Sequence, residues 1–284
     1  MVGRTVLVKN VAEAVGPDPA RTRFLRDARA AATISHPNVA TLFEVYDRPD
    51  QLLLVFEFVS GQTLEELLAR RPPDVRQSLD LGVQLVEAIG AAHSQGVLHL
   101  DVRPANIKIS LRGHAKLLDT GLSAWTRGGR IGRGSVDDRE ARDRDERYRS
   151  PEQRRGEPPD HRSDLYSIGV VLSEMLTGRA PADRASPGRA QRPGSKPDTA
   201  AVPPELAAIV TRAMAEQVED RYQSAVSFGA ELRSVAAILD IRSGDREPPS
   251  RVTATAEPSQ RSSGWVIPLL VVLALAFGAW LWLG

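Results

Sequence analysis

Residues 96–121 read GVLHLDVRPANIKISLRGHAKLLDTG. This stretch contains two aspartates and an asparagine whose spacing suggests a catalytic site. Asp101 and Asn106 lie five residues apart in a proline-containing loop that can direct a carboxylate and an amide into one cleft. Asp119 follows an apolar pair and precedes Thr-Gly, which places it at a strand end. One carboxylate to orient a hydroxyl, with an amide and a second carboxylate to hold Mg²⁺, suits phosphoryl transfer. For these residues alone, a β-hairpin with solvated polar side chains is the alternative.

The composition is that of a globular protein. The chain has 284 residues, of which 42% are hydrophobic and 26% charged, enough for one large domain or two lobes. A net charge of +1 gives no global electrostatic reason to expect nucleic-acid binding, and the absence of cysteine excludes disulfides and thiolate metal sites. Lys9 stands out because nearly all other basic residues are arginine.

Hydrophobic periodicity outside residues 96–121 predicts a β-rich first part and a helical second part, which together indicate an α+β fold. Thr63 and Glu66 form a capping box, and Gly178 is placed to end a helix. Strand patterns cover 4–9, 39–46 and 52–59, and helical patterns cover 18–35, 64–70, 75–95, 164–176, 204–216 and 223–239.

The stretch 96–121 resembles the catalytic and metal-binding loops of the protein kinase family. Within HLDVRPAN at 99–106, the Arg-Pro-Ala-Asn part is similar to the Lys-Pro-Ala-Asn of bacterial serine/threonine kinases. The resemblance extends, in order, over roughly residues 4–240. It implies a two-lobed kinase-like fold, with an incomplete N-lobe at 1–59 and a helical C-lobe at 60–240. The other motifs are VLVK (6–9), FLRDARAA (24–31), HPNV (36–39), VFEFVSG (55–61), DTG (119–121), YRSPEQ (148–153) and DRYQSA (220–225).

The resemblance assigns roles residue by residue, with ATP and Mg²⁺ as cofactors. It implies that Asp101 orients the substrate hydroxyl and accepts its proton, while Arg103 neutralises the transferring phosphate. Lys9 would contact the α- and β-phosphates, and Asn106 and Asp119 would ligate Mg²⁺.

Further positions complete the implied nucleotide site. Asp27 stands where the family has Glu, so an ion pair with Lys9 needs a closer approach. The backbones of Glu57 and Val59 would hydrogen-bond adenine, with Phe56 as gatekeeper. Outside this site, Glu152 would pair with Arg221, and Asp164 would brace the catalytic loop.

Several positions depart from the family pattern. Leu100 replaces the arginine that receives an activation-loop phosphate, Thr120 replaces an apolar packing residue, and Leu7 replaces a small alanine. Only eight residues precede Lys9, which leaves no room for the Gly-rich hairpin. Either the true start lies upstream, or the chain is a pseudokinase that serves as a scaffold or binding module.

The C-terminal segment WVIPLLVVLALAFGAWLWL, Trp265–Leu283, contains nineteen residues without a charge. At about 1.5 Å per residue a helix of this length matches a bilayer core, and we expect a single transmembrane helix after a linker at 241–264. A buried core helix is the alternative. Because arginines precede the span and no charge follows it, we expect the kinase portion to be cytosolic.

The predicted function is therefore a membrane-anchored serine/threonine protein kinase that transfers the ATP γ-phosphate to protein hydroxyls. The pseudokinase remains the alternative. The Arg-rich segment 126–149 is interpreted as a mixed-charge loop, with RNA binding as its own alternative. No motif reports on oligomeric state, and a homodimer is left open.

Overall fold

The computed structural model describes residues 3–11, 15, 19–48, 51–122, 125, 146–179 and 202–243. By its internal contacts the chain divides into two units, Met1–Arg242 and Ser243–Gly284. The predicted membrane span lies outside the described residues, as do nearly all of the predicted linker and of the loops at 126–149 and 181–203. Within the described ranges, no helix is both long enough and apolar enough to cross a bilayer.

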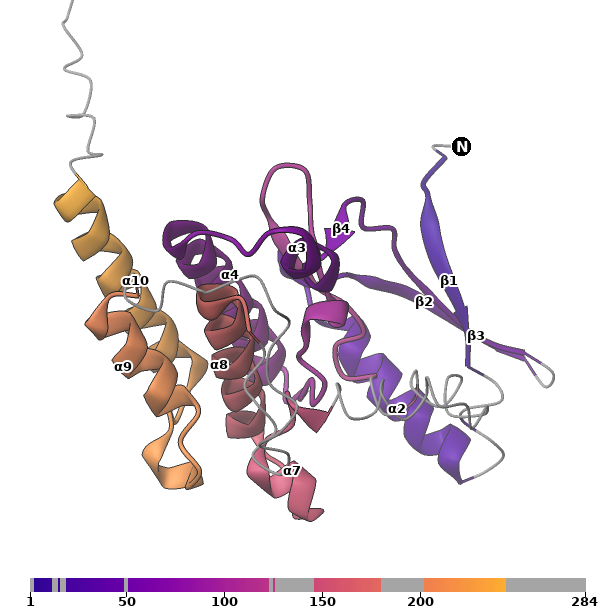
Figure 1. The fold of residues 1–284 in the computed structure, drawn as a ribbon. Helices are drawn as coiled ribbons and strands as arrows, with labels where there is room; N and C mark the ends of the chain where they lie inside the picture. Colours follow the sequence, from indigo (N-terminus) through magenta and orange to yellow (C-terminus); the bar gives the residue numbers. More distant parts are fainter. Residues whose placement is uncertain are drawn as a thin grey trace, which may run out of the picture. The chain divides into compact units, whose positions relative to one another are not determined.

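An antiparallel sheet forms the first part of the molecule, in the order β1-β3-β2 (Figure 1). It comprises β1 (Val6–Asn10), β2 (Leu42–Arg48) and β3 (Gln51–Glu57). Alternation along β3 buries Leu52, Leu54 and Phe56 on one face. Helix α2 (Ala20–Ala32) covers this face with its buried residues Phe24 and Ala28, as its three- and four-residue spacing predicted.

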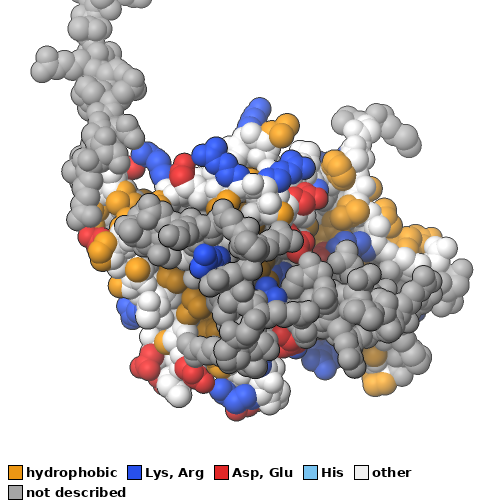
Figure 2. Space-filling view, in the orientation of Figure 1, with side chains coloured by type: hydrophobic (Ala, Val, Ile, Leu, Met, Phe, Trp, Pro, Cys, Tyr) orange, Lys and Arg blue, Asp and Glu red, His pale blue; other side chains and the backbone are white. Residues whose placement is uncertain are grey.

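Strand β1 lies at an edge of this sheet. Among the described strands it pairs only with β3, in a register that places Leu7 opposite Phe56 and Lys9 opposite Leu54. Val6, Leu7 and Val8 remain 38%, 40% and 51% exposed. Figure 2 shows hydrophobic side chains gathered where Figure 1 draws these strands.

The strand predicted at 39–46 begins later than expected, at Leu42. The residues before it run beside a second sheet instead, because the N–H of Ala40 donates to the carbonyl of Leu117 (2.8 Å) and the N–H of Leu117 donates to the carbonyl of Asn38 (2.8 Å). These backbone bonds tie the segment after α2 to β6 of the second sheet.

The second sheet carries the loops of interest. It contains β4 (Gln62–Thr63), β5 (Ile107–Ile109) and β6 (Ala115–Leu117). A 3₁₀ turn, η1 (Pro104–Asn106), leads into β5. Helix α3 (Leu64–Arg70) begins at the predicted capping box, in which the side chains of Thr63 and Glu66 each accept a hydrogen bond from the other's backbone N–H.

The second part of the described fold is helical, and the two-lobed α+β architecture predicted from the sequence is present (Figure 1). Its main core is built around α4 and α8, which pack together. The elements are α4 (Val75–Ser94), α7 (Pro151–Arg155), α8 (His161–Thr177), α9 (Pro204–Ala213), η4 (Val218–Asp220) and α10 (Ala225–Ser243).

Several helix bounds differ from the prediction: α2 is shorter at both ends, α9 ends three residues early and α10 ends four residues late. Helix α8 begins three residues early because the Asp160 side chain accepts from the N–H of Arg162 (2.7 Å) and caps it, whereas Asp164 is used elsewhere. Its end at Gly178, which has φ +66°, is as predicted. The five-residue helix α7 was not predicted, because it is too short to show a helical period.

Candidate active site

Lys9 of β1 and Asp119 form an ion pair. The Lys9 ammonium donates to both carboxylate oxygens of Asp119 at 2.6 Å, and both side chains are largely shielded from solvent. Asp119 has φ +57°, an uncommon backbone conformation for a non-glycine residue. Two residues on, Gly121 (φ +76°) lies so close to Val97 that a Cβ there would come within 2.5 Å of its side chain. The turn therefore depends on glycine, and it fixes the carboxylate that precedes it.

The predicted catalytic loop brings Asp101, Arg103 and Asn106 together. The Asn106 side-chain amide donates to Oδ2 of Asp101 (2.8 Å) and to its carbonyl (2.9 Å). Nε of Arg103 lies 3.3 Å from Oδ1 of Asp101. Asp101 is only 7% exposed, so these contacts hold its carboxylate in one orientation.

Backbone and side-chain bonds join this loop to the segment before Asp119. The N–H of Leu118 donates to the carbonyl of Asn106 (2.9 Å), and a ring nitrogen of His99 lies 3.0 Å from the carbonyl of Leu118. The loop that holds Asp101 and Asn106 and the segment that leads to Asp119 are therefore hydrogen-bonded to each other.

Asp164 braces the catalytic loop through hydrogen bonds to its backbone, as predicted. One of its oxygens accepts from the N–H of Leu100 (2.7 Å), and the other accepts from the N–H of His99 (2.9 Å) and lies 2.8 Å from a ring nitrogen of His93. Asp164 is fully buried. The bonds hold Leu100 at φ +60°, a strained conformation for a residue with a γ-branched side chain.

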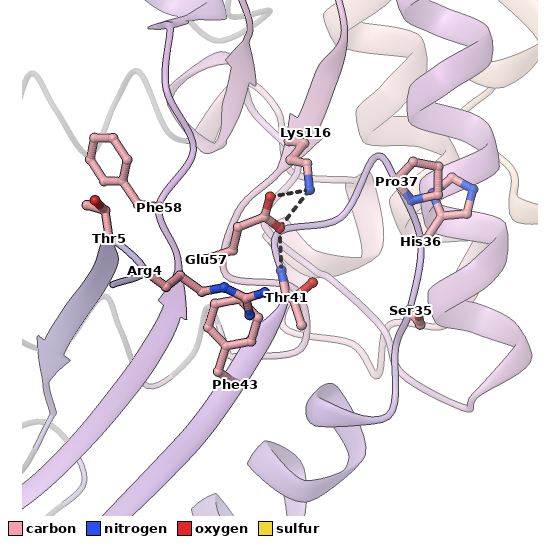
Figure 3. Close-up of a pocket in the computed structure, with 10 residues that line it drawn as sticks. All are labelled: Arg4, Thr5, Ser35, His36, Pro37, Thr41, Phe43, Glu57, Phe58 and Lys116. Atoms are coloured by element: carbon pink, nitrogen blue, oxygen red, sulfur yellow. Dashed lines mark hydrogen bonds and ion pairs between the residues drawn. The ribbon is translucent and has the colours of Figure 1, made fainter. Parts of the chain in front are cut away.

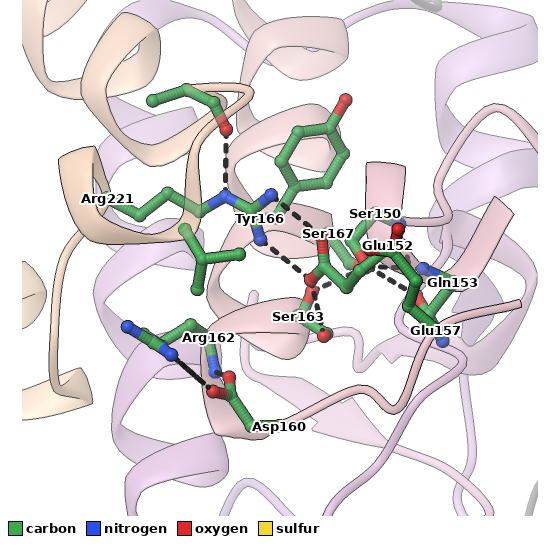
Figure 4. A network of polar contacts seen from close by, with 12 residues as sticks. Ser150, Glu152, Gln153, Glu157, Asp160, Arg162, Ser163, Tyr166, Ser167 and Arg221 are labelled. Carbon is green, nitrogen blue, oxygen red and sulfur yellow. Dashed lines mark hydrogen bonds and ion pairs between the residues drawn. The ribbon is translucent and has the colours of Figure 1, made fainter. Parts of the chain in front are cut away.

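The Glu152–Arg221 pair predicted from the sequence is present and buried (Figure 4). Two parallel bonds of 2.8 Å join the guanidinium to the carboxylate, and the Ser163 hydroxyl donates to the same carboxylate at 2.6 Å. Burial acts to raise the pKa of Glu152, but hydrogen bonds from Arg221 and Ser163 outweigh it and lower the pKa to about 2. The pair anchors α7 to the segment between η4 and α10.

The expected ion pair between Lys9 and Asp27 is not formed. Asp27 instead accepts from the indole N–H of Trp125 (3.1 Å) and from Arg26 (3.3 Å), while Lys9 is held by Asp119. The Trp125 ring also packs edge-on against Phe24 at 5.7 Å between centroids. The partners of Asp27 are therefore Trp125 and its own neighbour Arg26.

Trp125 is a site residue that the sequence reasoning missed. It is the only tryptophan outside the apolar C-terminal segment, and that isolation was the available signal. The contribution of His99, which contacts Leu118 and accepts from the N–H of Asp101 (3.2 Å), was also not foreseen.

The hinge positions lie at the end of β3. The Glu57 N–H donates to the carbonyl of Thr41 (2.8 Å), and its carboxylate binds Lys116. Val59 follows β3, and its backbone N–H and carbonyl have no hydrogen-bond partner among the described residues. Phe56 is buried, and the Lys9 ammonium lies 5.7 Å from its ring centroid.

The residues at this site fit a hard divalent cation. Asn106 and Asp119 offer amide and carboxylate oxygens, which suit Mg²⁺. The Asn106 nitrogen is directed to Asp101, and its side-chain oxygen, which has no hydrogen-bond partner among the described residues, is available to a further ligand. In the described part of the chain, no cluster of three or more His, Cys, Asp or Glu could hold a metal by itself, so a cation here needs ligands beyond the protein.

A lysine on a small sheet, two hydrogen-bonded acidic loops and a buried Glu–Arg pair in the helical part define the class of protein kinase folds. The chain belongs to the protein kinase family, since residues 2–225 match the model of the protein kinase domain.

The relatives agree with this assignment. The chain is 32% identical over 225 residues to the serine/threonine-protein kinase PrkC of Bacillus subtilis, covering 75% of this chain and 33% of PrkC. It is 35% identical over 243 residues to the serine/threonine-protein kinase PknB of Mycolicibacterium smegmatis, covering 81% and 38%. The predicted serine/threonine-kinase class is thereby confirmed at the level of the family. The chain spans 33% and 38% of the length of these two relatives.

Solved structures show the same fold. The Mycobacterium tuberculosis PknI kinase domain superposes with a TM-score of 0.59 at 25% identity, covering 81% of this chain and 85% of that one.

Proposed function

We propose that this protein is a serine/threonine protein kinase that transfers the γ-phosphate of ATP to hydroxyl groups of protein substrates. The observation that carries the proposal is the Asp101–Asn106 hydrogen bond of 2.8 Å within a loop that is itself bonded to the strand leading to Asp119. A pseudokinase scaffold is the less favoured alternative, because the sequence retains Lys9, Asp101, Asn106 and Asp119.

Each residue has one task in this proposal. Asp101 orients the substrate hydroxyl and takes its proton as the new bond forms, and Arg103 beside it supplies positive charge for the transferring group. Asn106 and Asp119 hold Mg²⁺, and Lys9 contacts the α- and β-phosphates. When bound, Mg-ATP supplies the phosphoryl group and the metal charge that offsets its negative oxygens.

The nucleotide base would lie against the end of β3. The unpartnered backbone groups of Val59, with the carbonyl of Glu57, can bind an adenine edge. Lys9 and Asp27 belong to the same site. For both to act on the nucleotide, Lys9 must leave Asp119, and Asp27 must leave Trp125.

The test is phosphate transfer from γ-labelled ATP to a generic acceptor protein. Asp101→Asn should reduce transfer by at least about 100-fold, the contribution typical of a general base, while Mg-ATP binding by thermal shift is retained. Asp80→Asn, at an exposed aspartate of α4, is the matched control and should transfer normally. Transfer that survives in Asp101→Asn would refute its role, whereas Mg-ATP binding without any transfer in the wild type would favour the scaffold.

Membrane anchoring through Trp265–Leu283, with the kinase portion cytosolic at the cell membrane, is the second part of the proposal. It rests on the uncharged apolar run and on the arginines that precede it. Because the chain has no cysteine, single-cysteine labelling is clean. An impermeant maleimide should label Gly284→Cys in intact cells and Ser250→Cys only after lysis. The reverse pattern would contradict this orientation.

A homodimer is compatible with this proposal. Light scattering of the full chain in detergent would show whether the particle holds one protein copy or two.

A further inference from the structure

A cavity with a volume of about 510 Å³ lies beside the end of β3 (Figure 3). Its lining comes from segments far apart in the sequence. These include Arg4 ahead of β1, Phe43 of β2, Glu57 and Phe58 at the end of β3, and Lys116 of β6. The volume is within the range of about 300–1,000 Å³ typical of small-molecule sites.

This cavity is separate from the proposed phosphate-transfer site. None of Lys9, Asp101, Asn106 or Asp119 lines it, and Glu57 contributes its side chain here but only its backbone carbonyl to the proposed adenine contact. A ligand in this cavity would therefore be a different molecule from the nucleotide.

Its one carboxylate is already neutralised. The Glu57 oxygens accept from the Lys116 ammonium at 2.6 and 2.7 Å, and one also accepts from the N–H of Thr41 at 3.2 Å (Figure 3). A cationic ligand would have to compete with this internal lysine for the carboxylate.

Whereas the charge of Lys116 is paired with Glu57, Arg4 gives the cavity a second positive charge. Its guanidinium lies over the Phe43 ring, 4.8 Å from the centroid, and it has no acidic partner among the described residues. A guanidinium that lies over an aromatic ring still has N–H groups for other partners, and a guanidinium can bind a carboxylate through two parallel hydrogen bonds.

The cavity also offers aromatic surface. Phe43 is 39% exposed and Phe58 is 51% exposed. In Figure 3, Phe58 lies to one side of Glu57, and Arg4 with Phe43 lies below it. Exposed phenyl rings next to a cation favour a ligand with a flat apolar ring and an anionic end.

We propose that this cavity is a binding site for a small aromatic carboxylate. The carboxylate pairs with the Arg4 guanidinium, and the ring packs against Phe43 and Phe58. The proposal does not rest on the kinase activity, because Arg4, Phe43 and Phe58, which would contact this ligand, have no role in the proposed phosphate transfer.

The probe is 6-fluoro-2-naphthoate, followed by fluorine NMR with the full chain in detergent against a detergent blank. Its neutral analogue, 6-fluoro-2-naphthamide, has the same ring without the charge. We expect saturable binding of the naphthoate that is at least tenfold tighter than that of the amide. Saturating Mg-ADP should leave naphthoate binding unchanged.

Arg4→Met should weaken naphthoate binding at least tenfold while the unfolding midpoint and Mg-ATP binding stay as in the wild type. Arg112→Met, at an exposed arginine of the β5–β6 turn, is the matched control and should bind normally. Equal affinity in wild type and Arg4→Met, displacement by Mg-ADP, or the absence of saturable binding would each overturn the proposal. Loss of transfer activity alone would bear on the kinase assignment and not on this site.

Discussion

Glu152→Gln should cause a large loss of stability. The variant keeps the shape of the side chain but removes the negative charge opposite Arg221, which is only 1% exposed. Arg221 would retain its bonds to the carbonyls of Ala215 (2.8 Å) and Glu216 (3.0 Å), yet its charge would be buried without a counter-ion. Removing one partner of a buried pair costs about 3–5 kcal/mol, a substantial part of the roughly 5–15 kcal/mol that stabilises a domain.

The pKa of Glu152 gives a second way to obtain the contribution of this carboxylate to the free energy of unfolding. Folding lowers the pKa of Glu152 from 4.5 to about 2, which corresponds to a stabilisation of about 3 kcal/mol. Because the folded-state pKa is the lower one, this contribution is fully present above pH 4.5 and is lost as the pH falls toward 2. The difference in free energy of unfolding between wild type and Glu152→Gln should therefore shrink steadily over this range.

Urea unfolding followed by circular dichroism at pH 7, 4 and 3 measures this difference. Glu157→Gln is the matched control, because Glu157 forms an exposed pair with Arg155 just beyond the same short helix, and we expect no measurable change. A loss below about 1 kcal/mol at pH 7, or one that does not vary with pH, would refute the reasoning, since a buried pair must show both effects.

Three other variants test the site and its supports. Asp164→Asn leaves one loop N–H without an acceptor, so we expect a loss of about 1–3 kcal/mol in unfolding and a lower kcat with KM for ATP less affected, as measured by urea titration and steady-state kinetics. Thr63→Ala removes the cap of α3 and should cost about 1 kcal/mol in the same titration without changing phosphate transfer. Trp125→Phe removes the donor to Asp27 and frees it for Lys9, so Mg-ATP should bind more tightly by calorimetry; unchanged affinity would show that the indole contact does not oppose binding.

Features set by local sequence were predictable. Helix α3 begins at Leu64 because the Thr63–Glu66 capping box is complete within four residues, and α8 ends at Gly178 because glycine accepts positive φ. The Glu152–Arg221 pair joins residues far apart in the chain. It was predictable only because the motifs that carry them resemble those of the family.

Contacts that depend on how separate elements pack were not predictable. The partner of Asp27 is decided by where α2 lies relative to Trp125, ninety-eight residues away, and no pattern around either residue encodes that distance. Likewise, Asp160 and not Asp164 is the N-cap of α8, because the Asp164 side chain accepts hydrogen bonds from the loop at residues 99–100. A helical period identifies a buried face but not which of two acids caps the helix.

The Lys9–Asp119 bond has a thermodynamic consequence for ligand binding. Lys9 is the proposed contact of the phosphates, and Asp119 is a proposed ligand of Mg²⁺. Their ion pair therefore competes with both the nucleotide and the metal. Whichever of the two binds first must open the contact, and the second then meets a site that is already open. Nucleotide and Mg²⁺ should therefore bind with positive cooperativity, each raising the affinity of the other by the same factor.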